Sequence, residues 1–178
     1  MLRALLSLII WTIPGLAFAG SSFTLPSTTT AYTANQLMAN SATAGSVVVP
    51  SFSVSAQSPG FDVIIPRLQL FINDTTASSW NAQQITIDLW SAAPTFTNGD
   101  RGTYSPATGT ASHLAAFTCT MSAVYGDGLY GECSINTGQA LSIPAPGPTQ
   151  IFWTATAKTG SGTTGASKTV TLNPEVAR

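Results

Sequence analysis

Short segments in which apolar and polar residues alternate recur along this chain, and they constrain its fold more than any other feature. In residues 84–90 three aliphatic side chains alternate with polar or aromatic ones, and residues 151–156 repeat the pattern. Because side chains point to opposite faces along a strand, this period of two predicts half-buried β-strands. Only residues 31–40 have a modest helical period. The pattern therefore indicates an all-β fold.

Further strand candidates follow at short intervals, with turn-forming residues between them. They are residues 46–54, 61–72, 115–124, 129–135, 141–143 and 167–172. Pro50 and Pro59 predict an edge position or a break around residues 46–54, and Pro66 predicts a bulge or bend in residues 61–72, because proline cannot donate to a ladder. About eight strands in one chain favour a single antiparallel β-sandwich that is jelly-roll-like.

Residues 1–19 have the features of a targeting segment. Arg3 supplies a positive charge, a short apolar stretch follows, and Ala-Phe-Ala stands directly before Gly20. This order is typical of a secretory signal with its cleavage site. The alternatives are a retained membrane anchor and a start assigned too far upstream. We expect membrane contact only if the segment is retained.

The remaining chain divides into an arm and a domain. Residues 20–44 are rich in serine, threonine and alanine without a steady apolar period, which predicts an extended arm before a β-sandwich domain at residues 45–178. Tyr32, Leu37 and Met38 are the candidate interface residues that would fix this arm to a neighbouring surface. The alternative interpretation is a flexible leader.

Two cysteines lie symmetrically about a strong turn signal. Cys119 and Cys133 are each seven residues from Gly126 in the sequence Tyr-Gly-Asp-Gly, and apolar runs flank the turn. A hairpin centred there would place the two cysteines opposite each other, which favours a disulfide in an oxidising compartment. Two buried free thiols are the alternative if the protein matures in the cytoplasm.

The charge of the chain excludes one class of partner. Charged residues make up 7% of the sequence and the net charge is −1, against roughly 25% charged residues in ordinary soluble domains. The six basic residues are scattered, whereas nucleic-acid binding needs clustered Lys and Arg. We therefore expect no nucleic-acid partner. A surface so poor in charge also favours association with other proteins.

No catalytic, cofactor or metal site emerges from the motifs. His113, the single histidine, would need an orienting carboxylate and a nucleophile, and the sequence indicates neither. Asn98 and Asp100 offer oxygen ligands, but two fall short of the six or more that calcium prefers. We favour a structural role in which Asp100 accepts bonds from amides of its own turn and pairs with Arg101. No glycine-rich phosphate loop is present.

Two further functional interpretations depend on side chains that the sequence leaves unplaced. A glycosidase needs two positioned carboxylates, and no pair stands out among the seven acidic residues. Trp80, Trp90 and Trp153 would suit a sugar-stacking platform, although tryptophans in β-sandwiches more often fill the core. We therefore expect a non-enzymatic protein whose surfaces carry its function.

Residues 30–172 contain a series of features that resembles one family of proteins. They are the opening at 30–39, the long strand at 64–72, the strand at 85–90 that leads through Pro-Thr-Phe into Asn-Gly-Asp-Arg-Gly-Thr-Tyr-Ser-Pro at 98–106, and the last strands near 151–157 and 167–172. This series resembles small tailed-phage virion proteins found among the head decoration, or cement, components.

The resemblance implies a jelly-roll-like domain on the outside of an icosahedral head, often as a homotrimer, that clamps the major capsid protein or another virion protein and has no active site. One feature disagrees, because tailed-phage heads assemble in the cytoplasm and need no secretory signal. The leading hypothesis is thus a capsid decoration protein at the head surface. The second is an exported, secreted or cell-surface β-sandwich adhesin, pilus-like subunit or carbohydrate-binding module, and a secreted hydrolase is a distant third.

Overall fold

The computed structural model describes nine stretches of the chain. They are residues 20–28, 30–54, 62–74, 80–108, 110–125, 128–136, 140–143, 149–160 and 168–177. The predicted targeting segment at 1–19 lies outside them. Within these stretches, no helix has the length and hydropathy needed to span a bilayer.

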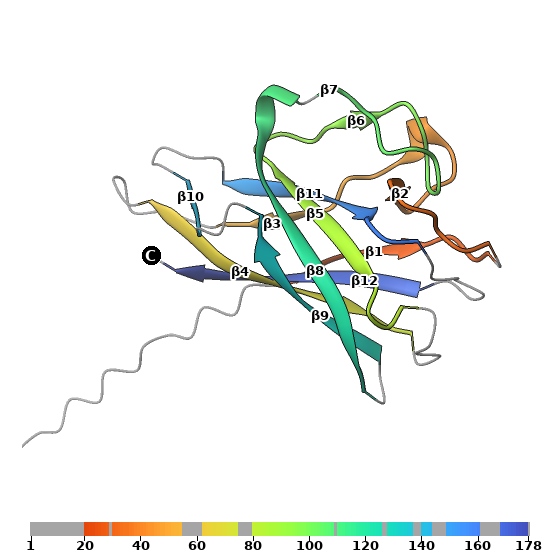
Figure 1. The fold of residues 1–178 in the computed structure, drawn as a ribbon. Coiled ribbons are helices and arrows are strands. Elements are labelled where there is room, and N and C mark those ends of the chain that lie inside the picture. The colour runs from red at the N-terminus through yellow and green to blue at the C-terminus, as the bar shows by residue number, and fades with distance from the viewer. Residues whose placement is uncertain are drawn as a thin grey trace, which may run out of the picture.

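The regular structure of the described residues is almost entirely β-strand (Figure 1). The strands are β1 (Ser21–Leu25), β2 (Gln36–Met38), β3 (Ser51–Ser53), β4 (Val63–Ile72), β5 (Gln84–Trp90), β6 (Thr95–Phe96), β7 (Pro106–Thr108), β8 (His113–Tyr125), β9 (Gly128–Ile135), β10 (Leu141–Ile143), β11 (Gln150–Ala157) and β12 (Lys168–Ala177). The described residues also include two single 3-10 turns, η1 (Ala44–Ser46) and η3 (Thr110–Ser112). The predicted all-β fold is confirmed.

The strand order is that of a jelly roll. The main sheet follows the path β1-β12-β4-β9-β8-β5-β11-β2. Four antiparallel pairs within it are nested along the chain: β1 with β12, β2 with β11, β4 with β9, and β5 with β8. This is the order produced when a long two-stranded ribbon rolls up, and rolling adds the ladders β12–β4, β9–β8 and β5–β11.

The roll forms two layers that are continuous through the long β8–β9 hairpin (Figure 1). One layer contains β1, β12, β4 and β9, and the other contains β8, β5, β11 and β2. The alternating side chains of both layers point inward and form one core, because apolar residues are buried at every second position. The fully buried members include Leu68, Leu70, Ile85, Ile87 and Ile151.

The two ends of this path differ. At one end, β1 continues in unbroken register along β12. At the other end, β2 and β3 have three residues each and share the free side of β11. β10 adds a three-residue ladder to β4. The roll is therefore open between β1 and the segment that contains β2 and β3.

The sheet continues across the boundary predicted at residue 45. The predicted arm at 20–44 is extended, but it contributes β1 to one layer and β2 to the other, so it forms part of the roll. Another prediction needs correction. Residues 46–54 form a strand only at 51–53, because Pro50 has no N–H for a ladder.

Residues 91–112, which connect β5 to β8, lie against the outward side of the β5–β11–β2 layer. Their β6–β7 hairpin carries Phe96, which packs with Leu37 and Ala39 in a second, smaller apolar cluster outside the main core. Thr103 also forms a bridge to Gln36 at the start of β2. One outward face of the roll is thus covered by the chain itself.

Candidate functional site

A polar cluster lies where residues 91–112 cover the sheet. Asp88 on β5 accepts a hydrogen bond from the Tyr104 hydroxyl at 3.0 Å, and its other oxygen lies 2.9 Å from Nε2 of His113 on β8. The Tyr104 hydroxyl also lies 3.2 Å from Oγ1 of Thr154, which accepts a bond from the Trp90 indole at 3.1 Å. Burial, followed by the Asp88 charge, raises the pKa of Tyr104.

This cluster provides the carboxylate partner that the sequence did not reveal for His113. The two residues are 25 positions apart, and they meet because the β5–β8 register places His113 opposite Trp90, beside a bulge. The indole ring also lies edge-on to the imidazole, with ring centroids 4.8 Å apart. Strand register is the information that sequence inspection lacked.

The chemistry of the pair is limited by its neighbours. Both oxygens of Asp88 are engaged by side chains of this chain. Among the described residues, His113 contacts Asp88 through its Nε2 and Trp90 through its ring, and neither partner supplies a hydroxyl or thiol. Among the residues that the structure describes, no three His, Cys, Asp or Glu side chains gather as a metal site would require. The arrangement is suited to fixing residues 91–112 on the sheet.

Asp100, a candidate calcium ligand, is engaged by donors of the protein. Its Oδ1 accepts bonds from the Tyr32 hydroxyl at 2.6 Å and from the Ala39 amide at 3.0 Å, and its Oδ2 pairs with the Arg101 guanidinium. The predicted Arg101 pairing is therefore present. The amide differs from the prediction, because it belongs to the segment after β2 and not to the turn of Asp100. The other candidate, Asn98, uses its amide to donate to the Thr103 carbonyl.

Burial determines the electrostatics of this cluster. It raises the pKa of Asp100, and the bonds from Tyr32 and Ala39 and the Arg101 charge act in the opposite direction. Burial also raises the pKa of Tyr32, and the adjacent Asp100 charge adds to the effect. Arg101 lies over the Tyr32 ring, 4.4 Å from its centroid. The group joins three separate segments of the chain.

The candidate interface residues Tyr32, Leu37 and Met38 point into the protein. Their exposed fractions are 1%, 2% and 2%. Tyr32 packs against Trp80 with ring centroids 5.7 Å apart, Met38 belongs to the main core, and Leu37 belongs to the smaller cluster. The neighbouring surface that they contact is therefore that of this domain. They fix their segment to this domain, because sequence alone does not tell which surface an apolar side chain covers.

The three candidate platform tryptophans are also interior. Trp80, Trp90 and Trp153 are exposed by 0%, 3% and 0%. Trp153 packs on Phe23 of β1, with centroids 5.3 Å apart, and its indole donates to Ser21 at 3.1 Å. These residues therefore do not form a sugar-stacking platform, in keeping with the preference of large aromatics for β-sandwich cores.

The outward face of the β1–β12–β4–β9 layer keeps its side chains accessible to solvent. We call it the open face and define it by residues that are exposed or half-buried: Arg67, Gln69, Phe71, Tyr130, Glu132, Thr171, Asn173 and Glu175. Thr171, Phe71 and Tyr130 form one row across three strands, and Asn173, Gln69 and Glu132 form the next. This face therefore presents side chains from three neighbouring strands to solvent.

The open face combines an aromatic pair with one guanidinium and two carboxylates, a net charge of −1. The Phe71 and Tyr130 rings lie 4.6 Å apart, and Tyr130 is 36% exposed. Nε of Arg67 lies 2.7 Å from a Glu175 oxygen, and its Nη1 lies 3.7 Å from a Glu132 oxygen. Exposed ion pairs of this kind contribute little to stability. Their effect is to leave the face with little net charge.

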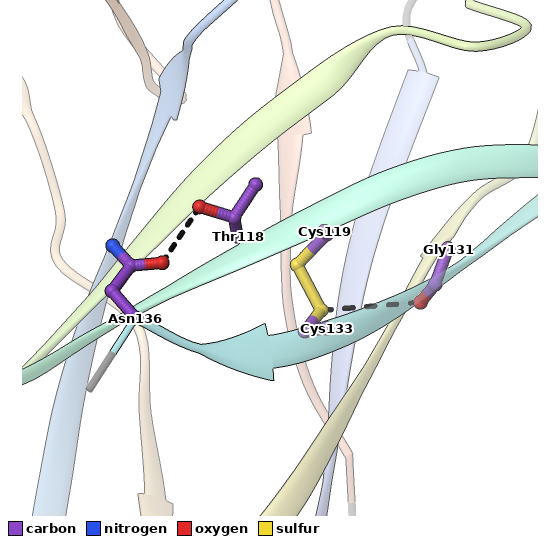
Figure 2. Close-up of a disulfide and its surroundings, with 5 residues drawn as sticks. All are labelled: Thr118, Cys119, Gly131, Cys133 and Asn136. Atoms are coloured by element: carbon purple, nitrogen blue, oxygen red, sulfur yellow. Dashed lines mark hydrogen bonds between the residues drawn. A yellow bond between two sulfur atoms is a disulfide. The ribbon is translucent and has the colours of Figure 1, made fainter. Parts of the chain in front are cut away.

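A disulfide lies behind the open face, on its core side (Figure 2). Cys119 on β8 is directly opposite Cys133 on β9, and the two sulfur atoms are bonded. Both residues are almost fully buried. On the outward side of the same ladder, Thr118 donates to the Asn136 side chain at 2.8 Å. The disulfide therefore cross-links the hairpin that joins the two layers.

Comparisons with known proteins return no match to a family model, to a curated protein or to a solved structure.

Proposed function

We propose that this chain is a non-enzymatic structural protein of a virion, a capsid decoration or cement protein that binds the outside of the head. The observation that carries the proposal is the open face, because it is broad, accessible and almost neutral. Protein interfaces are depleted in charge at their centre and enriched in aromatic side chains, as around Phe71 and Tyr130. The jelly roll is also a fold used by viral capsid domains.

The proposal takes the partner to be the major capsid protein or another virion protein, with the decoration protein acting as a homotrimer. A net charge of −1 on 178 residues removes most of the electrostatic repulsion between copies. Symmetric copies would each present the open face to equivalent sites on an icosahedral shell. The disulfide-linked β8–β9 hairpin and the polar clusters around Asp88 and Asp100 suit this role, because a clamp must resist deformation.

Binding to assembled shells tests the proposal. Shells of the major capsid protein encoded in the same genome are mixed with the full chain and sedimented. We expect saturable co-sedimentation at a fixed ratio and a higher disruption temperature for the decorated shells. The variant Tyr130→Lys should bind at least tenfold more weakly, because it places a charge at the centre of the interface. The control Ala107→Lys, at an exposed residue of β7 in the segment that covers the other layer, should bind normally.

A wild-type chain that stays in the supernatant at saturating concentration would rule out the decoration function. Equal loss in both lysine variants would show that binding follows overall charge and does not use the open face.

The second candidate is an exported carbohydrate-binding or adhesive domain, secreted or held at the cell surface. Two observations favour it: the disulfide, which suits an oxidising compartment, and the exposed Phe71–Tyr130 pair, on which a sugar ring could stack. A glycan array distinguishes the two functions. Selective glycan binding that is lost in Tyr130→Ala, without binding to shells, would favour this candidate.

A further inference from the structure

The edge of β1 lacks the features that protect exposed strands. Its five residues, Ser-Ser-Phe-Thr-Leu, include no charge and no proline, and its register with β12 has no bulge. Among the described strands, β12 is its only neighbour. Edge strands usually carry a lysine, a proline or a bulge, or are covered, because their unpaired backbone groups template the pairing of another chain.

The opposite edge of the roll has several of these protections. β2 and β3 are short, β3 follows Pro50, and the start of β2 is bridged to Thr103 of the covering segment. A short strand next to a proline offers few consecutive donors. Within the described part of the chain, the fold therefore protects one edge and leaves the other available.

A groove lies beside the available edge. It has a volume of about 430 Å³ and is lined by Ser22, Phe23, Thr24, Asn40, Val48 and Pro50. One wall is β1, and the other is the extended segment that precedes β3. Val48 is 66% exposed, the most of any large apolar residue among those described, and its amide donates to the Asn40 side chain at 2.8 Å. No lining residue carries a charge.

We propose that this groove binds an extended, uncharged peptide segment of a partner protein, which adds a strand to β1. The segment would exchange backbone hydrogen bonds with β1 and direct a small or β-branched side chain toward Val48, the arrangement of β-strand addition. A charged side chain would lose water without gaining a counter-ion, since the lining provides none. The inference rests on the proposed function and specifies how the chain holds its partner.

A single segment fits the site better than a second folded copy. The wall formed by residues 48–50 restricts the space beside β1, so a folded neighbour could not bring its own sheet edge alongside without moving that wall. Pairing through five residues would also bury far less than the roughly 1,000 Å² expected of a specific interface. A peptide in the groove contacts both walls and leaves the open face to supply the remaining area.

Peptide binding tests the site directly. The probe is the fluorescently labelled, terminally blocked heptapeptide Ser-Thr-Val-Thr-Val-Thr-Ser, measured by anisotropy against the full chain. We expect saturable binding and slower amide hydrogen exchange in β1. Val48→Lys should weaken binding at least tenfold. The control variant Ile64→Lys changes an apolar residue that is 37% exposed on β4, which β12 separates from β1. It should not alter binding.

The control peptide carries N-methyl groups at alternate residues, which removes its hydrogen-bond donors along one edge, and it should not bind. Equal binding of both peptides, equal effects of both lysine variants, or no binding would overturn the inference. So would β1 protection that rises with protein concentration in the absence of peptide, because it would indicate a second copy as the occupant.

Shell sedimentation separates this inference from the function on which it rests. If the wild-type chain sediments with shells and Val48→Lys does so equally well, the groove inference fails and the decoration function stands. If the heptapeptide binds but the wild-type chain does not sediment, the decoration function fails and the strand-addition site stands.

Discussion

Replacing Asp100 by alanine should destabilise the protein more than most single substitutions. The substitution removes the acceptor for the buried Tyr32 hydroxyl, the Ala39 amide and the Arg101 guanidinium. Each buried group left without a partner costs roughly 1–3 kcal/mol, and breaking a buried ion pair costs about 3–5 kcal/mol. The Arg101 side chain is 16% exposed and keeps a bond to the Thr30 carbonyl at 3.1 Å, so water and that carbonyl offset part of its loss.

These contributions overlap because one carboxylate serves all three donors. We expect Asp100→Ala to lower the free energy of unfolding by about 4 kcal/mol, within the range for buried ion pairs. For a domain of this length that corresponds to a fall in Tm of roughly 8–16 °C. Tyr32→Phe removes one donor and leaves the other two bonded, so it should cost about 1.5–2 kcal/mol.

Urea unfolding followed by tryptophan fluorescence measures both values, and an unchanged slope keeps the comparison valid. A loss below about 1 kcal/mol for Asp100→Ala, which is typical of surface sites, would refute the reasoning. Calcium provides a second check. A Tm that rises on adding calcium in the wild type but not in Asp100→Ala would reveal an ion site in place of the protein donors.

Two further outcomes follow from the disulfide and from the pKa of Asp100. The disulfide closes a loop with a sequence separation of 14. The free energy of unfolding of the double variant Cys119→Ala/Cys133→Ala should therefore be about 3 kcal/mol lower than that of the oxidised wild type. Equal stabilities in calorimetry would contradict this. Because burial raises the pKa of Asp100, its contribution to stability should be complete below about pH 3.9, the ordinary pKa of Asp, and fall as pH rises through the raised value. Urea curves of the wild type and Asp100→Asn between pH 3 and 7 test the sign, and a wild-type advantage that grows with pH would show that Arg101 and the two hydrogen bonds outweigh burial.

The alternation of apolar and polar residues correctly predicted the strands that have one face toward the core and the other away from it. Residues 84–90 were predicted with the bounds that β5 has, and β11 extends the predicted 151–156 by one residue at each end. β12 continues past the predicted end at Leu172 through Pro174, which pairs with Leu68. Proline is tolerated there because β12 extends beyond the end of β1, and β4 is the only described strand beside this part of it.

The pattern of apolar and polar residues did not determine where each strand lies within the fold. The alternating Phe23 and Leu25 of β1 carried a strand signal, but it was short and lay among small polar residues. The Asp88–His113 pair depends on the register between two strands, which the separate patterns of those strands do not determine. The accessibility of Phe71 and the burial of Trp90 likewise depend on which face residues 91–112 cover.

The nested pairing has a consequence for how the chain is made. Ser21 of β1 pairs with Leu172 of β12, so β1 leaves the ribosome about 150 residues before the strand that it needs as its partner. Contacts this distant in sequence close slowly, because the intervening chain must first be ordered. Until β12 has been synthesised, β1 stays accessible to chaperones and peptidases, and pairing with β12 then removes it from them.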